Sequence, residues 1–453
     1  MKNITNYEIS IKNSLIFIIP SLIGMLLFMI PIKFNGEITI PVALMSKYLA
    51  SSLEGYLTSI ITLTVCISAI FSIITKVFKP DFIIKNNFLN TLFNVSTVWF
   101  IARILGAVFC VLALFNFGPE IITNAGTGTF VLNDLLTILF TIFLFAGLLL
   151  PLLLNFGLLE FFGSLLTKVM RPIFTLPGRS SIDCITSWLG DGTLGILLTN
   201  KQYEEGFYSK REAAVISTTF SAVSITFSLI VIDTVGLSHL FIPFYLTVTL
   251  SGIVAAMILP RIYPLRKIPN HYYDNKMKKD DETIPHGHTS LSWGYKKALN
   301  KAEKNPGAKA FLIDGTKNVL DMWLGVLPVV MALATIALII AEYTSIFQIL
   351  GLPFIPYLKL LNVPEAISAS QTLVVGFADM LLPSVLAANS ITSDMTKFIV
   401  ACTSVSQLIY MSEVGGVLLG SKIPISLKQL IIIFIERTLI TLPVIVLISN
   451  IIF

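Results

Sequence analysis

Long uninterrupted runs of apolar residues constrain the fold of this chain more than any other feature. Many of these runs are roughly 20 residues long, which is the length that an α-helix needs to cross about 30 Å of hydrocarbon at about 1.5 Å per residue. Only 13% of the 453 residues are charged, compared with about 25% in an average soluble domain. We therefore expect an all-α polytopic membrane protein that resides in a lipid bilayer.

The apolar runs predict about nine transmembrane helices, together with two further segments that are described below. The first run follows Lys2 and Lys12, but it is long and no clear cleavage site follows it, so we interpret it as a membrane helix rather than a signal peptide. The four cysteines are isolated in apolar segments, which indicates neither a disulfide framework nor a zinc site. The nine predicted helices lie near residues 13–32, 54–77, 97–116, 131–155, 212–233, 238–260, 320–342, 396–416 and 428–451.

The positions of lysine and arginine predict the orientation of the chain in the membrane. Clusters follow the second, fourth and sixth predicted helices, for example Arg261, Arg266 and Lys267, and they all fall on one side if the N-terminus is cytoplasmic. The C-terminus then lies outside a bacterial cytoplasmic membrane, and the polar segment 261–319 forms a cytoplasmic loop. The formal net charge of +5 is explained by this topology, so we expect no nucleic-acid partner.

Two segments, 178–200 and 364–389, are long enough for one span each but are interrupted at their centres. Gly190, Asp191 and Gly192 interrupt the first; Gly376, Asp379 and Pro383 interrupt the second. A helical arm of about 10 residues rises about 15 Å and reaches only the midplane of the bilayer. We therefore expect two re-entrant helical hairpins. The alternative, an ordinary span at 178–200, would put the basic residues that follow it on the opposite side from those that precede it.

The two interrupted segments occur in halves of the chain that repeat one another. Each half contains a span, an aromatic amphipathic stretch, an interrupted segment and two further spans, so residues 131–260 match residues 320–453 after an N-terminal scaffold over 1–130. Equivalent points are separated by an odd number of crossings, which makes the repeat inverted. Inverted repeats with interrupted segments are typical of secondary transporters with a site at the midplane. A duplication with a purely structural role is the alternative.

Polar and ionisable residues inside these segments are the candidate functional groups, because each costs several kcal/mol in a membrane unless it is paired or hydrated. Asp191 and Asp379 occupy equivalent hairpin tips, where they could also act as simple caps of the backbone. Asp183 lies on the first arm, and its equivalent in the second hairpin is Gln371. The helices that follow the hairpins add the candidates Thr219, Ser221, Ser404, Gln407, Tyr410 and Glu413, although hydroxyl stripes also serve in helix packing.

Three more charged residues lie within predicted spans. Glu436 and Arg437 are neighbours midway along the last span, and Arg103 lies in the third. Adjacent residues point about 100° apart on a helix, so Glu436 and Arg437 are expected to pair with other helices. We predict a structural ion pair that involves these three residues.

Several motifs resemble one family of membrane proteins, the YjiH-like proteins with a "nucleoside recognition" Gate domain. The resemblance is carried by NGEITIPVA at 35–43, by the block GRSSIDCITSWLGDGTLGILLTNKQYEEGFYSKREAAVISTTFSAVSITFSL at 178–229, and by MSEVGG at 411–416. More distantly, the plan of hairpin and following helix is similar to concentrative nucleoside transporters. The resemblance implies a hairpin-gated core that moves like an elevator and is driven by a sodium or proton gradient. It implies substrate contacts at Ser187 and Thr193 in addition to the candidates above.

Together these features predict a secondary active transporter of a small polar metabolite, such as a nucleoside, nucleobase or amino acid. We expect Na⁺ or H⁺ as the coupling ion and no other cofactor. A non-transporting membrane subunit or signalling protein, docked through 261–319, is the alternative. An enzyme is not expected, because no nucleophile–base pair or metal-ligand cluster occurs in the spans and no GxxxxGK[ST] motif exists. A homo-oligomer would suit a scaffold that must stay fixed beside a moving core.

Overall fold

A computed structural model of the chain describes residues 11–30, 32–34, 37–189, 192–220, 225–275, 283–285, 287–304 and 307–453. Within these residues the fold is almost entirely helical, and seven helices are long and apolar enough to cross a membrane. The chain is therefore a multi-pass membrane protein. The seven helices or helix runs cover Ile11–Met29, Leu57–Phe78, Thr97–Leu114, Glu120–Leu154, Ser238–Arg261, Ala308–Tyr343 and Leu427–Ile452.

The N-terminal part contains α1 (Ile11–Met29), a short β-hairpin and a helical pair. Strands β1 (Ile32–Phe34) and β2 (Glu37–Thr39) pair in antiparallel fashion, an element that lies outside the all-α expectation. The amphipathic α2 (Pro41–Ser52) follows and packs against α9 (Leu136–Leu149). The pair consists of α3 (Leu57–Phe78) and α6 (Thr97–Leu114), joined by α4 (Asp81–Ile84) and α5 (Asn87–Phe93). Helices α7 (Glu120–Thr123) and α8 (Gly128–Phe130) lead into α9.

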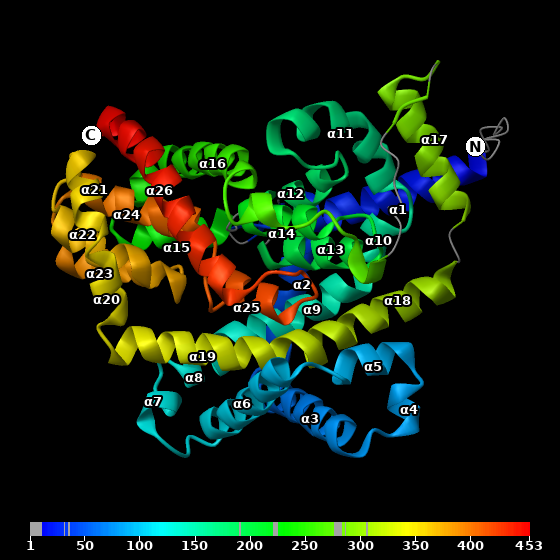
Figure 1. Ribbon diagram of the computed structural model, residues 1–453, viewed down its shortest axis with the longest axis horizontal. Coiled ribbons are helices and arrows are strands. Elements are labelled where there is room, and N and C mark those ends of the chain that lie inside the picture. Colours follow the sequence, from blue (N-terminus) through cyan, green and yellow to red (C-terminus); the bar gives the residue numbers. More distant parts are fainter. Residues whose placement is uncertain are drawn as a thin grey trace.

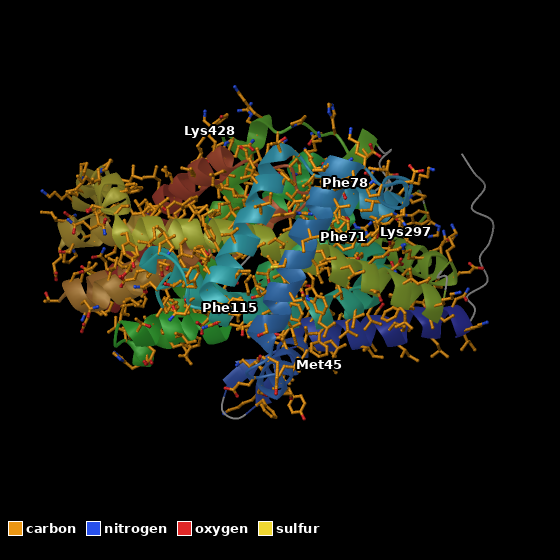
Figure 2. The ribbon with its side chains drawn as sticks, turned by 90° about the horizontal axis from the view of Figure 1, so that it is seen from below. Met45, Phe71, Phe78, Phe115, Lys297 and Lys428 are labelled. Carbon is orange, nitrogen blue, oxygen red and sulfur yellow. The ribbon has the colours of Figure 1, made fainter. Side chains whose placement is uncertain are left out.

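One long helical rod organises the molecule. Helices α18 (Ala308–Asp321) and α19 (Leu327–Tyr343) are continuous through a π-helical turn at Met322–Val326. Figure 1 shows this rod with α3 to α7 on one side and most of the other helices on the opposite side. Figure 2 shows α3 and α6 lying across the rod, with Met45 of α2 near the edge of the molecule. The rod packs on α9, where Trp323 stacks on Phe140 at a centroid distance of 4.1 Å.

The two halves of the chain contain similar series of elements. The first runs from α9 through α10 (Pro151–Leu154), α11 (Leu158–Phe174), α12 (Ser180–Leu189), α13 (Gly192–Glu204), α14 (Lys210–Thr219), α15 (Ile225–Thr234) and α16 (Phe241–Ile258). The second runs from α19 through α20 (Ile346–Gly351), α21 (Phe354–Leu360), α22 (Ala366–Leu373), α23 (Leu382–Ser390), α24 (Asp394–Gln407), α25 (Val414–Gly420) and α26 (Leu427–Ile452). A π-helical turn also begins α9, at Val131–Leu135, as one begins α19.

The structure corrects the expectation of a continuous helix after the second interrupted segment. The predicted span 396–416 is broken: α24 ends at Gln407, and Leu408 has a left-handed φ of +65° before α25 begins at Val414. In the predicted span 212–233 the structure describes α14 up to Thr219 and α15 from Ile225, and residues 221–224 lie outside the described part. An apolar composition does not reveal such breaks, because hydropathy is insensitive to backbone conformation.

The predicted polar loop 261–319 contains an ordered helix. Helix α17 (Ser290–Glu303) begins at a capping box formed by Thr289 and Ser292 and buries one face against α11 and α1. The Tyr295 hydroxyl donates to Ser14 Oγ at 2.8 Å. Small residues permit this close packing, since a Cβ at Gly294 would lie 2.8 Å from the Phe161 carbonyl oxygen. The rod helix α18 also begins inside the predicted loop.

Candidate functional site

The second interrupted segment forms a helix–turn–helix unit whose turn is bound to the break between α24 and α25. Two backbone amides of the break, those of Met411 and Ser412, donate to the carbonyl oxygens of Phe377 and Ala378 at 2.8 and 3.0 Å. Asp379 adds a side-chain link, because its Oδ2 accepts from Ser412 Oγ at 2.8 Å. Helix ends leave backbone groups without intrahelical partners, so these contacts satisfy groups that the break exposes.

Asp379 therefore serves as a cap of its own turn as well as a link to the break. Its Oδ1 accepts from the Leu381 backbone amide at 2.8 Å, which is the arrangement of an Asx turn. Both carboxylate oxygens thus have a partner, and each retains capacity to accept a further donor.

Gln407, the last residue of α24, has one buried polar atom without a partner. Its Nε2 donates to the Leu373 carbonyl and to Thr438 Oγ1, both at 2.9 Å. Its Oε1 is buried and accepts no hydrogen bond from any of the described residues. A side chain at Gly376 would overlap with this oxygen, so the glycine is what lets the Gln407 amide approach the turn so closely. An orphaned buried acceptor is costly, at about 1–3 kcal/mol, and indicates a donor from outside the described protein atoms.

Tyr410 and Arg437 stabilise the ends of the broken helices. The buried Tyr410 hydroxyl lies 2.7 Å from the Val405 carbonyl oxygen, to which it donates, and it accepts from the Leu408 amide at 3.2 Å. Arg437 of α26 donates from Nε to the Ser406 carbonyl at 2.9 Å and from Nη1 to the Thr218 carbonyl at 3.0 Å. One guanidinium thus caps the C-terminal ends of both α24 and α14, where the helix dipoles favour positive charge.

The predicted ion pair among Arg103, Glu436 and Arg437 needs correction. The hydrogen bonds of Arg437 within the described chain go to backbone carbonyls, because two helix ends meet at its position. Arg103 instead donates to Ser72 Oγ at 3.1 Å and the Leu92 carbonyl at 2.8 Å, and it lies beside Asp321. Glu436 Oε2 has no hydrogen-bond partner among the residues that the structure describes.

The first interrupted segment contains two helices that pack against each other, α12 and α13, and residues 190–191 between them lie outside the described part. Its arms approach closely because Gly195 faces Ser187, and any side chain at Gly195 would overlap with the serine hydroxyl. Thr193 is also buried in this unit. Asp191, the predicted tip residue, lies outside the described residues.

Asp183 lies at the open end of this unit rather than at its turn, and it is fully buried in a polar network. Its Oδ2 accepts from Thr199 Oγ1 at 2.8 Å and its Oδ1 from Gln202 Nε2 at 2.7 Å. Gln202 Nε2 also donates to the Tyr208 hydroxyl at 3.0 Å, which extends the network. Arg179 Nε in turn donates to Gln202 Oε1 at 2.6 Å. This network joins the ends of α12 and α13, which gives Asp183 a structural role.

The structure brings some of the remaining candidate residues together and separates others. Ser404 donates to its own helix at Ala401, and Thr219 to Val215, so both hydroxyl protons are already engaged. Glu413 is partly buried at the start of α25 and acts electrostatically on Tyr410. Gln371 is exposed on α22. Ser221 lies outside the described residues.

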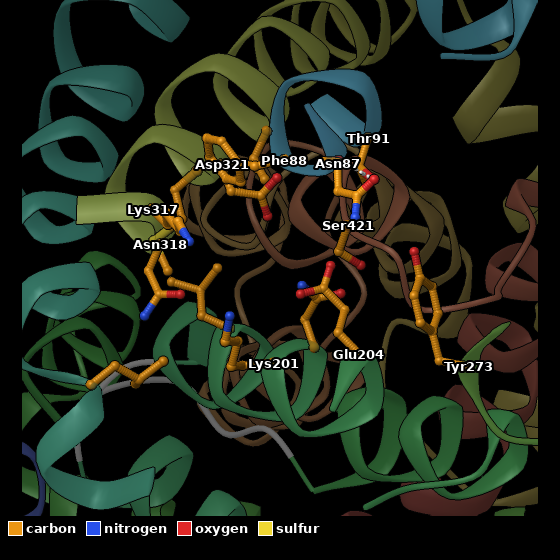
Figure 3. Close-up of a pocket in the computed structure, with 15 residues that line it drawn as sticks. Asn87, Phe88, Thr91, Lys201, Glu204, Tyr273, Lys317, Asn318, Asp321 and Ser421 are labelled. Carbon is orange, nitrogen blue, oxygen red and sulfur yellow. Dashed lines mark hydrogen bonds between the residues drawn. The ribbon is translucent and has the colours of Figure 1, made fainter. Parts of the chain in front are cut away.

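A cavity of about 520 Å³ lies between α13 and the rod, and the sequence did not single it out. Figure 3 shows Lys201 and Glu204 of α13 on one side, with Asp321 of the rod and Asn87 of α5 across from them. These residues come from distant parts of the chain. The one indication of the cavity in the sequence is that several of them are charged residues near the ends of helices. Its other lining residues are Phe88, Thr91, Leu150, Leu197, Asn200, Tyr273, Lys317, Asn318, Met322, Val326 and Ser421. Among the described residues, no group of three or more His, Cys, Asp and Glu side chains could hold a metal ion.

Comparisons with known proteins agree with the expected Gate relation. The family described as "Gate: Nucleoside recognition" matches residues 136–238, which include α12, α13 and α14. Among solved structures, CNTnw in an inward-facing substrate-bound state covers 90% of this chain and 98% of its own, at 12% identity and a TM-score of 0.37. A doubly substituted CNTnw in an outward-facing state covers the same shares of the two chains, at 12% identity and a TM-score of 0.35.

A curated relative matches almost the whole chain. It is an uncharacterized protein, BpOF4_10220, of Alkalihalophilus pseudofirmus, and it is 50% identical over 441 residues. The match covers 97% of this chain and 95% of the relative. The chain therefore belongs to the same protein family as the Alkalihalophilus pseudofirmus protein, and its residues 136–238 match the Gate family model.

Proposed function

We propose that the chain is a secondary active transporter of a small polar metabolite, and that the substrate binds where the α22–α23 turn meets the break between α24 and α25. The observation that carries this proposal is the buried Oε1 of Gln407 beside Gly376, which has no partner among the described residues. A substrate hydroxyl or amine would supply the donor that this oxygen lacks. The free acceptor capacity of Asp379 at the same turn suits a second donor on the substrate.

Other orphaned polar atoms occur in the same set of elements. Within the described part of the chain, buried side-chain oxygens without partners occur in α12 at Thr186, in α14 at Ser217, in α15 at Ser228 and in α23 at Ser384. Such atoms are rare in native proteins, and each calls for an explanation. These four atoms lie in the two interrupted segments and in α14 and α15, and further atoms of this kind lie in α1, α6, α11, α17, α20 and α26, so Gln407 Oε1 and Asp379 carry the proposed site.

The proposal includes two re-entrant hairpins in inverted halves, with α12–α13 entering from the cytoplasm and α22–α23 from outside. The repeated order of elements and the π-helical turn at the start of both α9 and α19 support this arrangement. The N-terminus is cytoplasmic and the C-terminus is outside in this topology. Alternating access would then move the hairpins and broken helices against a scaffold of α3, α6 and the rod.

Two observations indicate the substrate class: the site has acceptor atoms that need hydrogen-bond donors from the substrate, and a family model matches part of the chain. A nucleoside, a nucleobase or an amino acid carries both hydroxyl or amine donors and a compact polar body. The description "nucleoside recognition" of the matching family favours a nucleoside. The coupling ion is Na⁺ or H⁺.

Uptake by purified protein in proteoliposomes tests the proposal. A panel of radiolabelled nucleosides, nucleobases and amino acids would be offered under separate Na⁺ and pH gradients. Asp379→Asn and Gln407→Leu are expected to reduce uptake at least tenfold. Asp394→Asn, on the exposed first turn of α24, is the matched control and should transport normally. Failure of the wild-type protein to accumulate any panel member above empty liposomes would overturn the proposal.

A second role as a docking protein would use the segment 261–319. Helix α17 buries Trp293, Ala298 and Leu299 within the chain, so its apolar face is already occupied. The segment therefore gives less support to this role than its polar composition suggested.

A further inference from the structure

Glu436 is a carboxyl group inside a membrane span that the proposed site does not use. It belongs to α26, one of the helices that are long and apolar enough to cross a membrane. The last polar residue before it is Gln429, which lies about 10 Å away along the helix axis at about 1.5 Å per residue. Long lysine and arginine side chains near helix ends can reach the interface, but the shorter glutamate at this depth cannot.

The surroundings of Glu436 on its own helix provide no partner for its carboxyl group. Its Oε2 is buried and accepts no hydrogen bond from any described residue. No ion pair or charge interaction with Glu436 occurs within the described part of the chain. Arg437, the next residue, donates to carbonyl oxygens at the ends of α24 and α14 instead. The residues one turn away on the same helix are all apolar: Ile432, Ile433, Leu439 and Ile440.

The elements that pack against α26 also leave this carboxyl group unpaired. Helices α24 and α16 and the 3₁₀ turn Leu259–Arg261 contact α26. Helix α21 reaches it through Tyr357, whose hydroxyl donates to the Leu439 carbonyl at 2.8 Å. Across the described chain, no charged or titratable residue of these elements or of the break forms a hydrogen bond or ion pair with Glu436. These residues are Tyr245, Arg261, Tyr357, Lys359, Asp394, Lys397, Cys402, Tyr410 and Glu413.

An unpaired carboxyl group at this depth holds a proton. Hydrocarbon neither solvates a negative charge nor donates hydrogen bonds, so an ionised carboxylate without a partner is costly there. The protonated group avoids this cost, and it ionises when water reaches it. The charge of Glu436 therefore depends on whether this part of α26 is dry or hydrated.

The turn of α26 that carries Glu436 also holds the broken helices and the proposed site. Arg437 donates to the carbonyl oxygens of Ser406 and Thr218, at the ends of α24 and α14. Thr438 Oγ1 accepts from Gln407 Nε2 at 2.9 Å, and Gln407 is the residue whose Oε1 lacks a donor. Movement or hydration of this turn would therefore affect Glu436 and Gln407 together.

We propose that Glu436 carries the coupling proton of the transporter. This inference rests on the proposed transporter function and selects H⁺ as its coupling ion. Glu436 takes up a proton from water on one side of the membrane and stays protonated while its surroundings are dry. It releases the proton to water on the other side when alternating access hydrates this turn of α26. Proton binding at Glu436 does not itself depend on the identity of the substrate.

Carbodiimide labelling of the full-length protein in liposomes tests proton binding. Dicyclohexylcarbodiimide is an apolar reagent that forms a stable N-acylurea with protonated carboxyl groups inside membranes. Peptide mass spectrometry should find this adduct at Glu436. Asp394, an acidic residue on the exposed first turn of α24, is the matched control and should stay unlabelled.

Uptake in proteoliposomes tests the coupling role, with the substrate that the panel identifies. Glutamine resembles protonated glutamate but cannot release a proton. Glu436→Gln should therefore lose at least tenfold in accumulation driven by a pH gradient, while exchange of labelled for unlabelled substrate stays within about twofold of the wild type. Glu436→Asp keeps a carboxyl group and should restore part of the accumulation, and Asp394→Asn should accumulate substrate normally.

Four results would overturn the inference. They are an unlabelled Glu436 in the wild type, full pH-driven accumulation in Glu436→Gln, an equal loss of accumulation and exchange in that variant, and wild-type accumulation that needs Na⁺ alone. The last result would still support the transporter. An adduct at Glu436 in a protein that transports no panel member would contradict the transporter and its coupling, but would support proton binding at this residue.

Discussion

Replacement of Arg437 by methionine tests the way in which the broken helices are held together. The side chain is almost completely buried, and its guanidinium donates to the carbonyl oxygens of Ser406, Thr218 and Thr219 at 2.9, 3.0 and 3.3 Å. Methionine fills a similar volume but donates nothing. Three carbonyls at the ends of α14 and α24 would then lack this donor.

The expected cost can be worked out from these contacts. Each buried carbonyl without a partner costs about 1–3 kcal/mol, and the loss is partly offset because a buried charge no longer has to be desolvated. We expect a net destabilisation of about 2–4 kcal/mol, which is large for a single substitution. Lysine keeps the charge but cannot reach both helix ends with a planar fork, so Arg437→Lys should fall between methionine and the wild type.

Thermal unfolding of purified variants in detergent measures this effect. The matched control is Glu436→Gln, one residue earlier on α26, where the Oε2 of the glutamate has no partner to lose among the described residues. The control should unfold within about 0.5 kcal/mol of the wild type, as substitutions away from specific contacts usually do. If Arg437→Met unfolds at the same temperature as Glu436→Gln, Arg437 does not stabilise the two helix ends and the reasoning is refuted.

Three further predictions follow from the same structure. Gly376→Ala should reduce uptake at least tenfold because its Cβ would overlap with Gln407 Oε1, whereas Gly126→Ala, with only one contact at 3.4 Å, should transport normally; equal uptake would contradict the site. Asp183→Asn should destabilise the protein by about 2–3 kcal/mol and lower its unfolding temperature, because an amide cannot accept from both Thr199 and Gln202. The KM for uptake by the folded variant should not change. A changed KM with normal stability would indicate substrate contact instead. Hydrogen bonds from Thr392 and Ser393 hold the pKa of Glu365 below its ordinary 4.5, so its stabilisation of the start of α24 should persist above pH 4.5 and disappear as the pH falls through the lowered value. Faster amide exchange at residues 392 and 393 in Glu365→Gln, but not in Glu342→Gln, would confirm it, and unchanged exchange would exclude it.

Hydropathy was sufficient to predict the helical membrane fold, and the two re-entrant hairpins stay a prediction. Asp379 was predictable as a turn residue, because the same glycine- and proline-rich pattern that interrupts a helix marks its turn. Gln407 was predictable as a polar residue with no packing role inside an apolar helix. The lack of a hydrogen-bond partner for its Oε1 could not be predicted, because it depends on the path of the backbone at Gly376.

The remaining site features arise from contacts between distant parts of the chain. Arg437 was expected to pair with a carboxylate, since sequence shows charges but not the unpaired carbonyls of two converging helix ends. Asp183 was placed among the binding residues because its partners, Thr199 and Gln202, become visible only when α12 folds back on α13. The break at Leu408 could not be predicted from the sequence, because residues 408–413 contain neither glycine nor proline.

The most direct test of the central claim is an electron cryo-microscopy map of the wild-type protein in lipid, saturated with whichever substrate the uptake panel identifies. The account predicts substrate density between the turn at 377–381 and the break at 408–413, with a donor of the substrate within about 3.2 Å of Gln407 Oε1. Density confined to the cavity lined by Glu204 and Asp321, in a protein that transports that substrate, would contradict the proposed site.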